Sequence, residues 1–185
     1  MNTTRIRRKT RDAAFQFRMG AGFAGDVNRT HPASIDPVLN DATNPVLLAG
    51  LACLPNAAAN GVRSIAAGDT TMTSPYGVMV RSYPFQVASA TNFGAQAFGA
   101  SALAGGTIQD TLRSGYIMVQ LPAGAAAVGK GSPVFVWCAV SGGAHVQGGF
   151  EAVATGGSTA ALDTGRFSYN GAADATGIVE LAFNI

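Results

Sequence analysis

The sequence predicts an all-β protein, a single β-barrel or jelly-roll-like sandwich with a long extended N-terminal arm. From residue 46 onward, short apolar runs alternate with Gly, Asn, Asp and Pro at a spacing of about 8–12 residues, which is typical of barrels and sandwiches. No long window repeats its apolar residues with the 3.6-residue period of an amphipathic helix. The 185 residues fit one domain with a buried core, and only 12% of them are charged. Few charges remain to cover the surface, so we expect partners to cover part of it.

Residues 1–45 differ from the rest of the chain and are interpreted as an extended arm. Pro32, Pro37 and Pro45 lack a backbone N–H donor, and each biases the preceding residue toward extended geometry. A short helix near residues 11–18 is an option within this otherwise extended arm. At about 3.3 Å per residue, the fully extended arm spans roughly 150 Å. Such a reach is useful for linking neighbouring molecules.

Most of the positive charge lies in this arm. Residues 1–18 hold six basic residues and one acidic residue, a net charge of +5, whereas the remaining chain has a net charge of −3. Basic arms bind acidic surfaces, and an acidic protein face is favoured here over nucleic acid, because the body has no basic groove with interleaved aromatic residues. A solvated tail is the alternative. The candidate partner-binding residues of the arm are Arg5, Arg7, Arg8, Lys9 and Arg11 for acidic faces, with Phe15, Phe17 and Phe23 as apolar anchors.

Residues 46–185 are predicted to form the β body. Residues 86–110 are expected to be a loop or insertion, because Gly94 and Gly99 each cost a helix about 1 kcal/mol and the apolar spacing is weak. The predicted strands are rich in β-branched and aromatic residues in places and are bounded by turn-forming residues. They span residues 46–54, 62–66, 76–83, 116–121, 134–140, 145–154, 159–162, 165–169 and 178–183.

The two cysteines are interpreted as buried free thiols. Cys53 and Cys138 both lie in apolar runs, and unpaired cysteine in such runs packs as a small apolar residue. The basic N-terminus is not followed by the apolar core of a secretory signal, so we expect synthesis in a cytoplasm. The longest strongly apolar run, residues 46–54, is far shorter than a membrane-spanning helix.

Residues 20–25 match the dinucleotide-binding pattern G-x-G-x-x-G, but neither the preceding strand nor the following helix of that motif is indicated. We interpret these glycines as positions where the arm passes close to another backbone. His31 and His145 have no ligands at metal-binding spacing, and no nucleophile elbow, P-loop or paired carboxylate motif is present. The sequence therefore predicts no catalytic, cofactor-binding or metal-binding residues, and no cofactor.

Several patterns of glycine, turn and strand residues follow one another from about residue 20 to the end of the chain. They are GFAGDV at 22–27, AGDT at 67–70, YGVMVRSYP at 76–84, DTLRSGYIMV at 110–119, KGSPVFV at 130–136, GGFEA at 148–152 and GIVELAFNI at 177–185. In this order, they resemble the structural cement (capsid decoration) proteins of tailed bacteriophages. The basic residues 1–18 are not part of the resemblance.

The resemblance implies a non-enzymatic all-β protein that binds the outer surface of an icosahedral phage head and stabilises contacts between major capsid proteins. The implied partners are the major capsid protein and other copies of the chain, with a trimer favoured and a dimer as the alternative, and neither nucleic acid nor membrane. The implied location is the exterior of the virion, after synthesis in the host cytoplasm. Two alternatives stay open: another virion structural β protein (minor head, tail or fibre-associated), and a small β-barrel ligand-binding or enzymatic module.

Overall fold

The computed structural model describes residues 22–28, 33–81 and 103–185. This part of the chain holds ten β-strands, a single-turn 3-10 helix (η2, Asp69–Thr71) and no α-helix, so the predicted all-β fold class is confirmed. The strands are β1 (Ser34–Leu39), β2 (Ala52–Asn56), β3 (Gly61–Ser64), β4 (Gly77–Met79), β5 (Ile108–Gln120), β6 (Phe135–Trp137), β7 (Phe150–Glu151), β8 (Thr159–Ala161), β9 (Phe167–Tyr169) and β10 (Ile178–Phe183).

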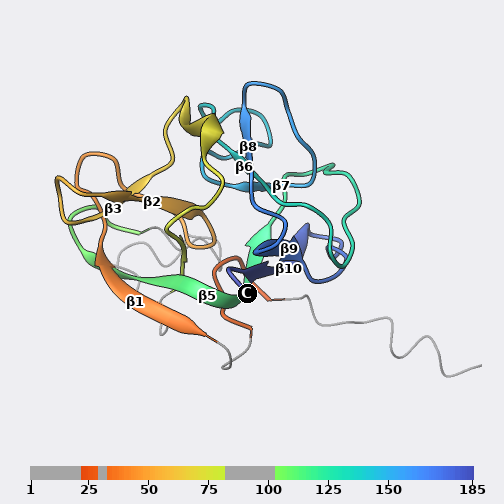
Figure 1. Ribbon diagram of the computed structural model, residues 1–185, viewed down its shortest axis with the longest axis horizontal. Helices are drawn as coiled ribbons and strands as arrows, with labels where there is room; N and C mark the ends of the chain where they lie inside the picture. Colours follow the sequence, from red (N-terminus) through yellow and green to blue (C-terminus); the bar gives the residue numbers. More distant parts are fainter. Residues whose placement is uncertain (1–21, 29–32, 82–102) are drawn as a thin grey trace, which may run out of the picture.

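The strands form two antiparallel sheets, arranged as a sandwich. The larger sheet has the order β3-β2-β4-β5-β10-β9, with β1 added against β5, and the smaller sheet has the order β7-β6-β8. In Figure 1, the small sheet lies on the same side of the molecule as β9 and β10, whereas β1, β2 and β3 lie on the other side. The shared core is therefore concentrated where the small sheet covers the β10–β9 end of the large one.

Strand β5 holds the larger sheet together. Its first half pairs with β1 on one edge and β4 on the other, and Leu112 lies opposite a residue of each. Its second half pairs with β10, and Ile117 forms a bridge to Val27 in the N-terminal segment. Between the halves lies Gly115, whose φ of 137° is rarely adopted by residues with a side chain. Glycine thus lets one strand turn between two sets of neighbours.

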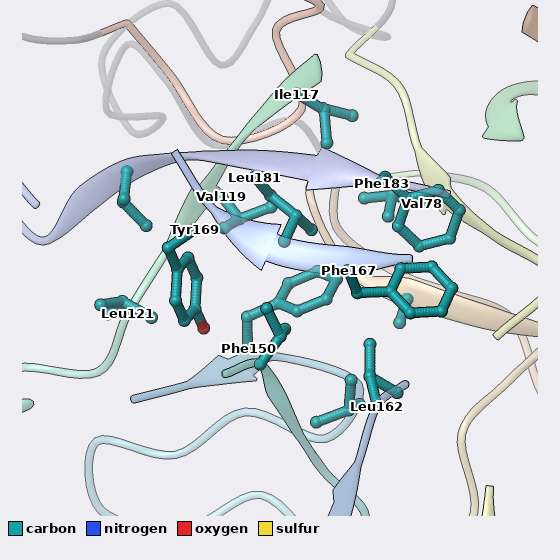
Figure 2. Packing of buried hydrophobic residues seen from close by; sticks show 14 of the residues in the cluster. Val78, Ile117, Val119, Leu121, Phe150, Leu162, Phe167, Tyr169, Leu181 and Phe183 are labelled. Atoms are coloured by element: carbon teal, nitrogen blue, oxygen red, sulfur yellow. The ribbon is translucent and has the colours of Figure 1, made fainter. Parts of the chain in front are cut away.

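The main core consists of apolar side chains from both sheets. Figure 2 shows Phe150 of the small sheet packed near Phe167 and Leu181 of the large one. The rings of Phe167 and Phe183 lie 4.9 Å apart between centroids, at an interplanar angle of 60°. Each such buried side chain contributes about 1.5–3 kcal/mol through removal of apolar surface from water. This packing joins the two sheets.

A second, smaller cluster lies under β2, β3 and β4. The end of β1 reaches this cluster, because Asn40 forms a parallel bridge with Val62 of β3. The buried Asn40 side chain donates to the carbonyl of Val46 and accepts from its N–H, each at 2.9 Å, so the polar amide is satisfied inside the core. The buried members of the cluster are Val46, Cys53, Val62, Met79 and Leu103.

Each of the nine predicted strands overlaps an observed strand, but β1 was not predicted and β5 was predicted too short. Strand β1 lies within the stretch predicted as an extended arm, and it contains Pro37. It pairs with β5 on one side only, and an edge strand tolerates the missing N–H of proline. Strand β5 begins at Ile108, inside the loop predicted for residues 86–110. Of that loop, residues 86–102 lie outside the described part of the chain, as do residues 11–18, for which a short helix was an option.

The cysteine prediction is confirmed, because Cys53 and Cys138 are both buried and unpaired. Burial raises the pKa of Cys53 from 9.0 to about 12. Burial, and secondly the nearby charge of Glu151, also raise the pKa of the Tyr169 hydroxyl. Both groups therefore stay protonated in the folded protein when their unfolded counterparts have ionised.

Close packing of β4 on β5 gives a first testable prediction. A methyl group at Gly77 would lie 2.3 Å from Cγ2 of Thr111 and 2.7 Å from the carbonyl oxygen of Leu112. We expect Gly77→Ala to lower the free energy of unfolding by about 1–3 kcal/mol through overpacking, measured by urea denaturation. Gly156→Ala is the matched control, because nothing lies within 4 Å of its added methyl group. Equal urea midpoints for the two variants would contradict this packing.

The raised pKa values predict alkaline destabilisation. Between about pH 9 and 12, the unfolded Cys53 thiol loses a proton that the folded thiol keeps. Unfolding then releases protons, so stability falls as pH rises, by up to about 1.4 kcal/mol per pH unit for each such group. Urea unfolding from pH 8 to 11 should show this slope, and Cys53→Ala should make it shallower. An identical slope in both proteins would show that Cys53 ionises equally in the two states.

Candidate partner-binding surface

Among the residues that the sequence predicts for partner binding, Phe23 is the one that the structure describes. Its side chain is 48% exposed, so it is available to a partner. The others lie outside the described residues: Arg5, Arg7, Arg8, Lys9, Arg11, Phe15 and Phe17.

Phe23 lies on a turn that is stabilised by contacts with Arg81. The Asp26 N–H donates to the Phe23 carbonyl at 3.0 Å, and the Phe23 N–H donates to Oδ2 of Asp26 at 3.0 Å. The guanidinium of Arg81 lies 4.5 Å from the centroid of the Phe23 ring and 3.4 Å from Oδ1 of Asp26. The cation–π contact and the ion pair hold the aromatic ring in place at the surface.

Gly25, in the same turn, is the glycine of the 20–25 pattern that packs directly against another stretch of backbone. A methyl group at Gly25 would lie 2.6 Å from Cβ of Ala49 and 3.0 Å from the backbone nitrogen of Gly50. The Gly25 N–H donates to the carbonyl of Met118 at 2.8 Å, and its φ is +89°. The prediction that these glycines allow close backbone approach is thus confirmed at Gly25. After Gly25, Val27 forms a bridge to Ile117 of β5. A dinucleotide-binding motif would instead begin a helix at this point.

An apolar cleft of about 330 Å³ lies beside the turn. Its walls come from four segments: the turn at Ala24, residues 48–51 before β2, residues 120–123 at the end of β5, and the hairpin of residues 144–149 before β7. Leu48 and Val146 are 38% and 39% exposed, respectively, at this cleft. Glu151 is the one charged residue among those that line it. The cleft therefore combines a small apolar pocket with a single acidic side chain.

The hairpin wall of the cleft is held by a histidine, a carboxylate and an indole. Nδ1 of His145 lies 2.8 Å from Oε1 of Glu151, whose side chain is 5% exposed. The His145 ring stacks on Trp137 with centroids 4.2 Å apart and an interplanar angle of 13°. The Tyr169 hydroxyl donates to the Glu151 backbone carbonyl at 2.9 Å. These contacts fix the hairpin and give the buried carboxylate a partner.

A second group of exposed apolar side chains follows the edge formed by β1 and β5. Leu39 lies opposite Ile108 in the strand register, and these two side chains are 37% and 71% exposed. Ile35, on the same strand, is 43% exposed. Exposed apolar groups on an edge strand are typical of surfaces that contact partners.

Sequence reasoning missed both the cleft and the edge. Leu48 lies in the apolar run of residues 46–54, for which the sequence predicts a strand. The first residue of this run, Val46, is buried. Nothing in the run indicates that Leu47 and Leu48 face outward. The cleft also depends on contacts between segments about one hundred residues apart, which one sequence does not show.

Within residues 22–28, 33–81 and 103–185, no group of three or more His, Cys, Asp or Glu side chains is placed to hold a metal ion. The same residues contain no helix with the length and apolar character needed to cross a membrane.

Comparison with known proteins identifies the class to which this β body belongs. A family model described as the XM1 gp53 minor capsid protein matches residues 13–183. The chain is therefore a phage capsid-associated structural protein of the virion. More specifically, it belongs to the XM1 gp53 minor capsid protein family. The phage capsid-associated family expected from the sequence resemblance is thus confirmed.

A solved structure has the same fold. A chain in the structure described as "The capsid of Myoviridae Phage XM1" matches with a TM-score of 0.62 and 16% sequence identity, over 91% of this chain and 93% of that chain. A comparison with curated protein sequences gave no match.

The hairpin contacts give a testable prediction for the cleft wall. His145→Ala leaves the buried Glu151 carboxylate without its imidazole partner, which should lower the free energy of unfolding by about 1–3 kcal/mol. His145→Gln keeps a hydrogen-bond donor, so its free energy of unfolding should fall by less. Adding Glu151→Gln to His145→Ala removes the buried charge and should restore part of the lost free energy of unfolding. Urea denaturation of the wild type, His145→Ala, Glu151→Gln and the double variant measures the coupling. Strictly additive effects would show that the two side chains do not interact.

Proposed function

We propose that this protein is a capsid decoration protein, which binds the outer surface of an icosahedral phage head and stabilises contacts between major capsid proteins. The observation that carries the proposal is the family match over residues 13–183. The sandwich supports it, because exposed apolar side chains lie at two separate places, the cleft and the β1–β5 edge. A molecule with two such surfaces is suited to contact two neighbours, which can be a second copy of the chain and the major capsid protein.

The stabilisation is mechanical and non-enzymatic. Each copy contributes a modest set of contacts to the major capsid protein, and icosahedral symmetry repeats them over the shell. When one contact has formed, the next forms at high effective concentration, so many weak contacts add up to firm attachment. Copies of the chain associate with one another, with a trimer favoured over a dimer.

The basic arm supplies the second kind of contact. Residues 1–18 have a net charge of +5, and the remainder of the chain has a net charge of −3. Arg5, Arg7, Arg8, Lys9 and Arg11 bind an acidic face of the capsid protein, and Phe23 is an apolar anchor at the base of the arm. Exposed charge pairs of this kind weaken as salt is added.

A truncation tests the role of the arm. The deletion should remove residues 2–18 and stop there, because Gly25 and Val27 are bonded to β5 and their loss would damage the body. We expect an unchanged urea midpoint and at least about tenfold weaker co-sedimentation with capsids of the phage that carries this protein. Lys130→Gln, which removes an exposed basic residue of the body, is the control and should co-sediment normally. Equal co-sedimentation of truncated and full-length protein would contradict arm binding.

The place of the protein on the head separates decoration from the alternative of a minor head component, with which the words "minor capsid protein" in the family description also agree. Cryo-electron microscopy of the virion should show this chain in many copies over the outer shell. A few copies at one vertex would overturn the decoration role and leave a minor head protein.

A further inference from the structure

We propose that residues 15–19 of one copy dock into the apolar cleft of a second copy. The cleft has a volume of about 330 Å³ and is lined by Leu48, Pro122 and Val146, among other small and apolar residues. Cavities of this size accept compact apolar groups. Three features of the chain indicate which group fills it.

The first feature is the pattern of the arm. Phe15, Phe17 and Met19 alternate with Gln16 and Arg18. In an extended segment, successive side chains point to opposite sides, so the three apolar side chains lie on one side and the two polar ones on the other. Such a segment can place an aromatic ring in a pocket while its polar side stays in water.

The second feature is the direction in which the arm leaves the body. The turn at Phe23–Asp26 has Ala24 at its tip, and Ala24 lines the cleft. Gly22 lies at the open end of the turn, where an added methyl group would be 3.6 Å from Cγ of Met118. From Ala24, which lines the cleft, the described chain runs to Gly22, which does not line it. For residues 15–19 to enter their own cleft, the chain would have to reverse once more within a few residues. Over the stretch from Phe15 to Gly22, which reaches roughly 25 Å at about 3.3 Å per residue, the cleft of a second copy can be entered without that reversal.

The third feature is charge. Residues 1–18 have a net charge of +5, whereas the cleft is lined by Glu151 and by no basic residue. A basic segment can thus enter without like-charge repulsion, and the net charge of −3 on the rest of the chain favours its approach. Copies joined in this way form a homo-oligomer.

Cysteine cross-linking between two separately prepared chains tests the proposal. One chain carries Phe17→Cys and the other carries Ala144→Cys, at an exposed residue of the cleft wall. The native thiols Cys53 and Cys138 are fully buried and do not compete. After mixing and oxidation with copper–phenanthroline, we expect a disulfide-linked pair on non-reducing gels. Ala126→Cys, exposed and outside the cleft, replaces Ala144→Cys in the control, which should give at least about tenfold less of the linked pair.

The same assay separates a second copy from self-docking. A chain carrying both Phe17→Cys and Ala144→Cys should give linked chains of higher mass. A link confined to single chains, together with none in the mixed sample, would overturn the proposal, as would equal yields for positions 144 and 126.

Oligomeric mass gives an independent readout. Val146→Arg places a bulky positive charge in the cleft and should weaken association by at least about tenfold in light scattering over a dilution series. Val153→Arg is the matched control, because Val153 is 52% exposed and does not line the cleft. Equal association of the two variants would contradict cleft docking. Both experiments use the purified full-length chain without capsids, so their outcome is independent of the proposed decoration role.

Discussion

The structure depends on the backbone pairing of one long strand. β5 runs from Ile108 to Gln120 and carries different neighbours on its two halves. All of these neighbours belong to one sheet, which β5 joins along its length. Gly115 lies between the β1–β4 section and the β10 section, and its φ of 137° is a backbone geometry that residues with a side chain rarely adopt. The smaller core then forms beside the first half, and the main core forms beside the second half against the small sheet.

The cleft is a consequence of the same arrangement. Where β5 ends, the chain leaves the large sheet, and the hairpin before β7 comes across from the small sheet. The turn at Phe23–Asp26 closes the third side, because Gly25 is bonded to Met118 of β5. The cleft therefore has walls from both sheets and from the N-terminal segment. The stacked His145 and Trp137 and the buried Glu151 hold its hairpin wall. Its shape is set by the same strand pairing that sets the fold.

The sequence predicts the strands of this molecule better than its surface. β10 was predicted with its observed bounds, since the apolar run at Ile178–Phe183 ends at clear turn residues. β1 was missed because Pro37 argues against a strand, although an edge strand tolerates proline. The first half of β5 was missed because Gln109 and Asp110 interrupt its apolar pattern, and partners on both edges hold it extended all the same. The close approach at Gly25 was predictable from glycine spacing. The cleft was not, because it joins segments that only the folded chain brings together.

The small share of charged residues in the chain can now be related to its surfaces. A small sandwich with 12% charged residues covers little of its surface with ion pairs, and exposed apolar side chains remain at the cleft and along the β1–β5 edge. In an isolated monomer such surfaces favour aggregation. A protein that associates with a capsid can cover such surfaces with its neighbours, which lowers its need for surface charge. Half of the twelve basic residues lie in residues 1–18, and under the proposed function they attract acidic partners without adding charge to the body. The proposed function thus gives the low-charge body and the basic arm different kinds of contact, apolar for the body and electrostatic for the arm.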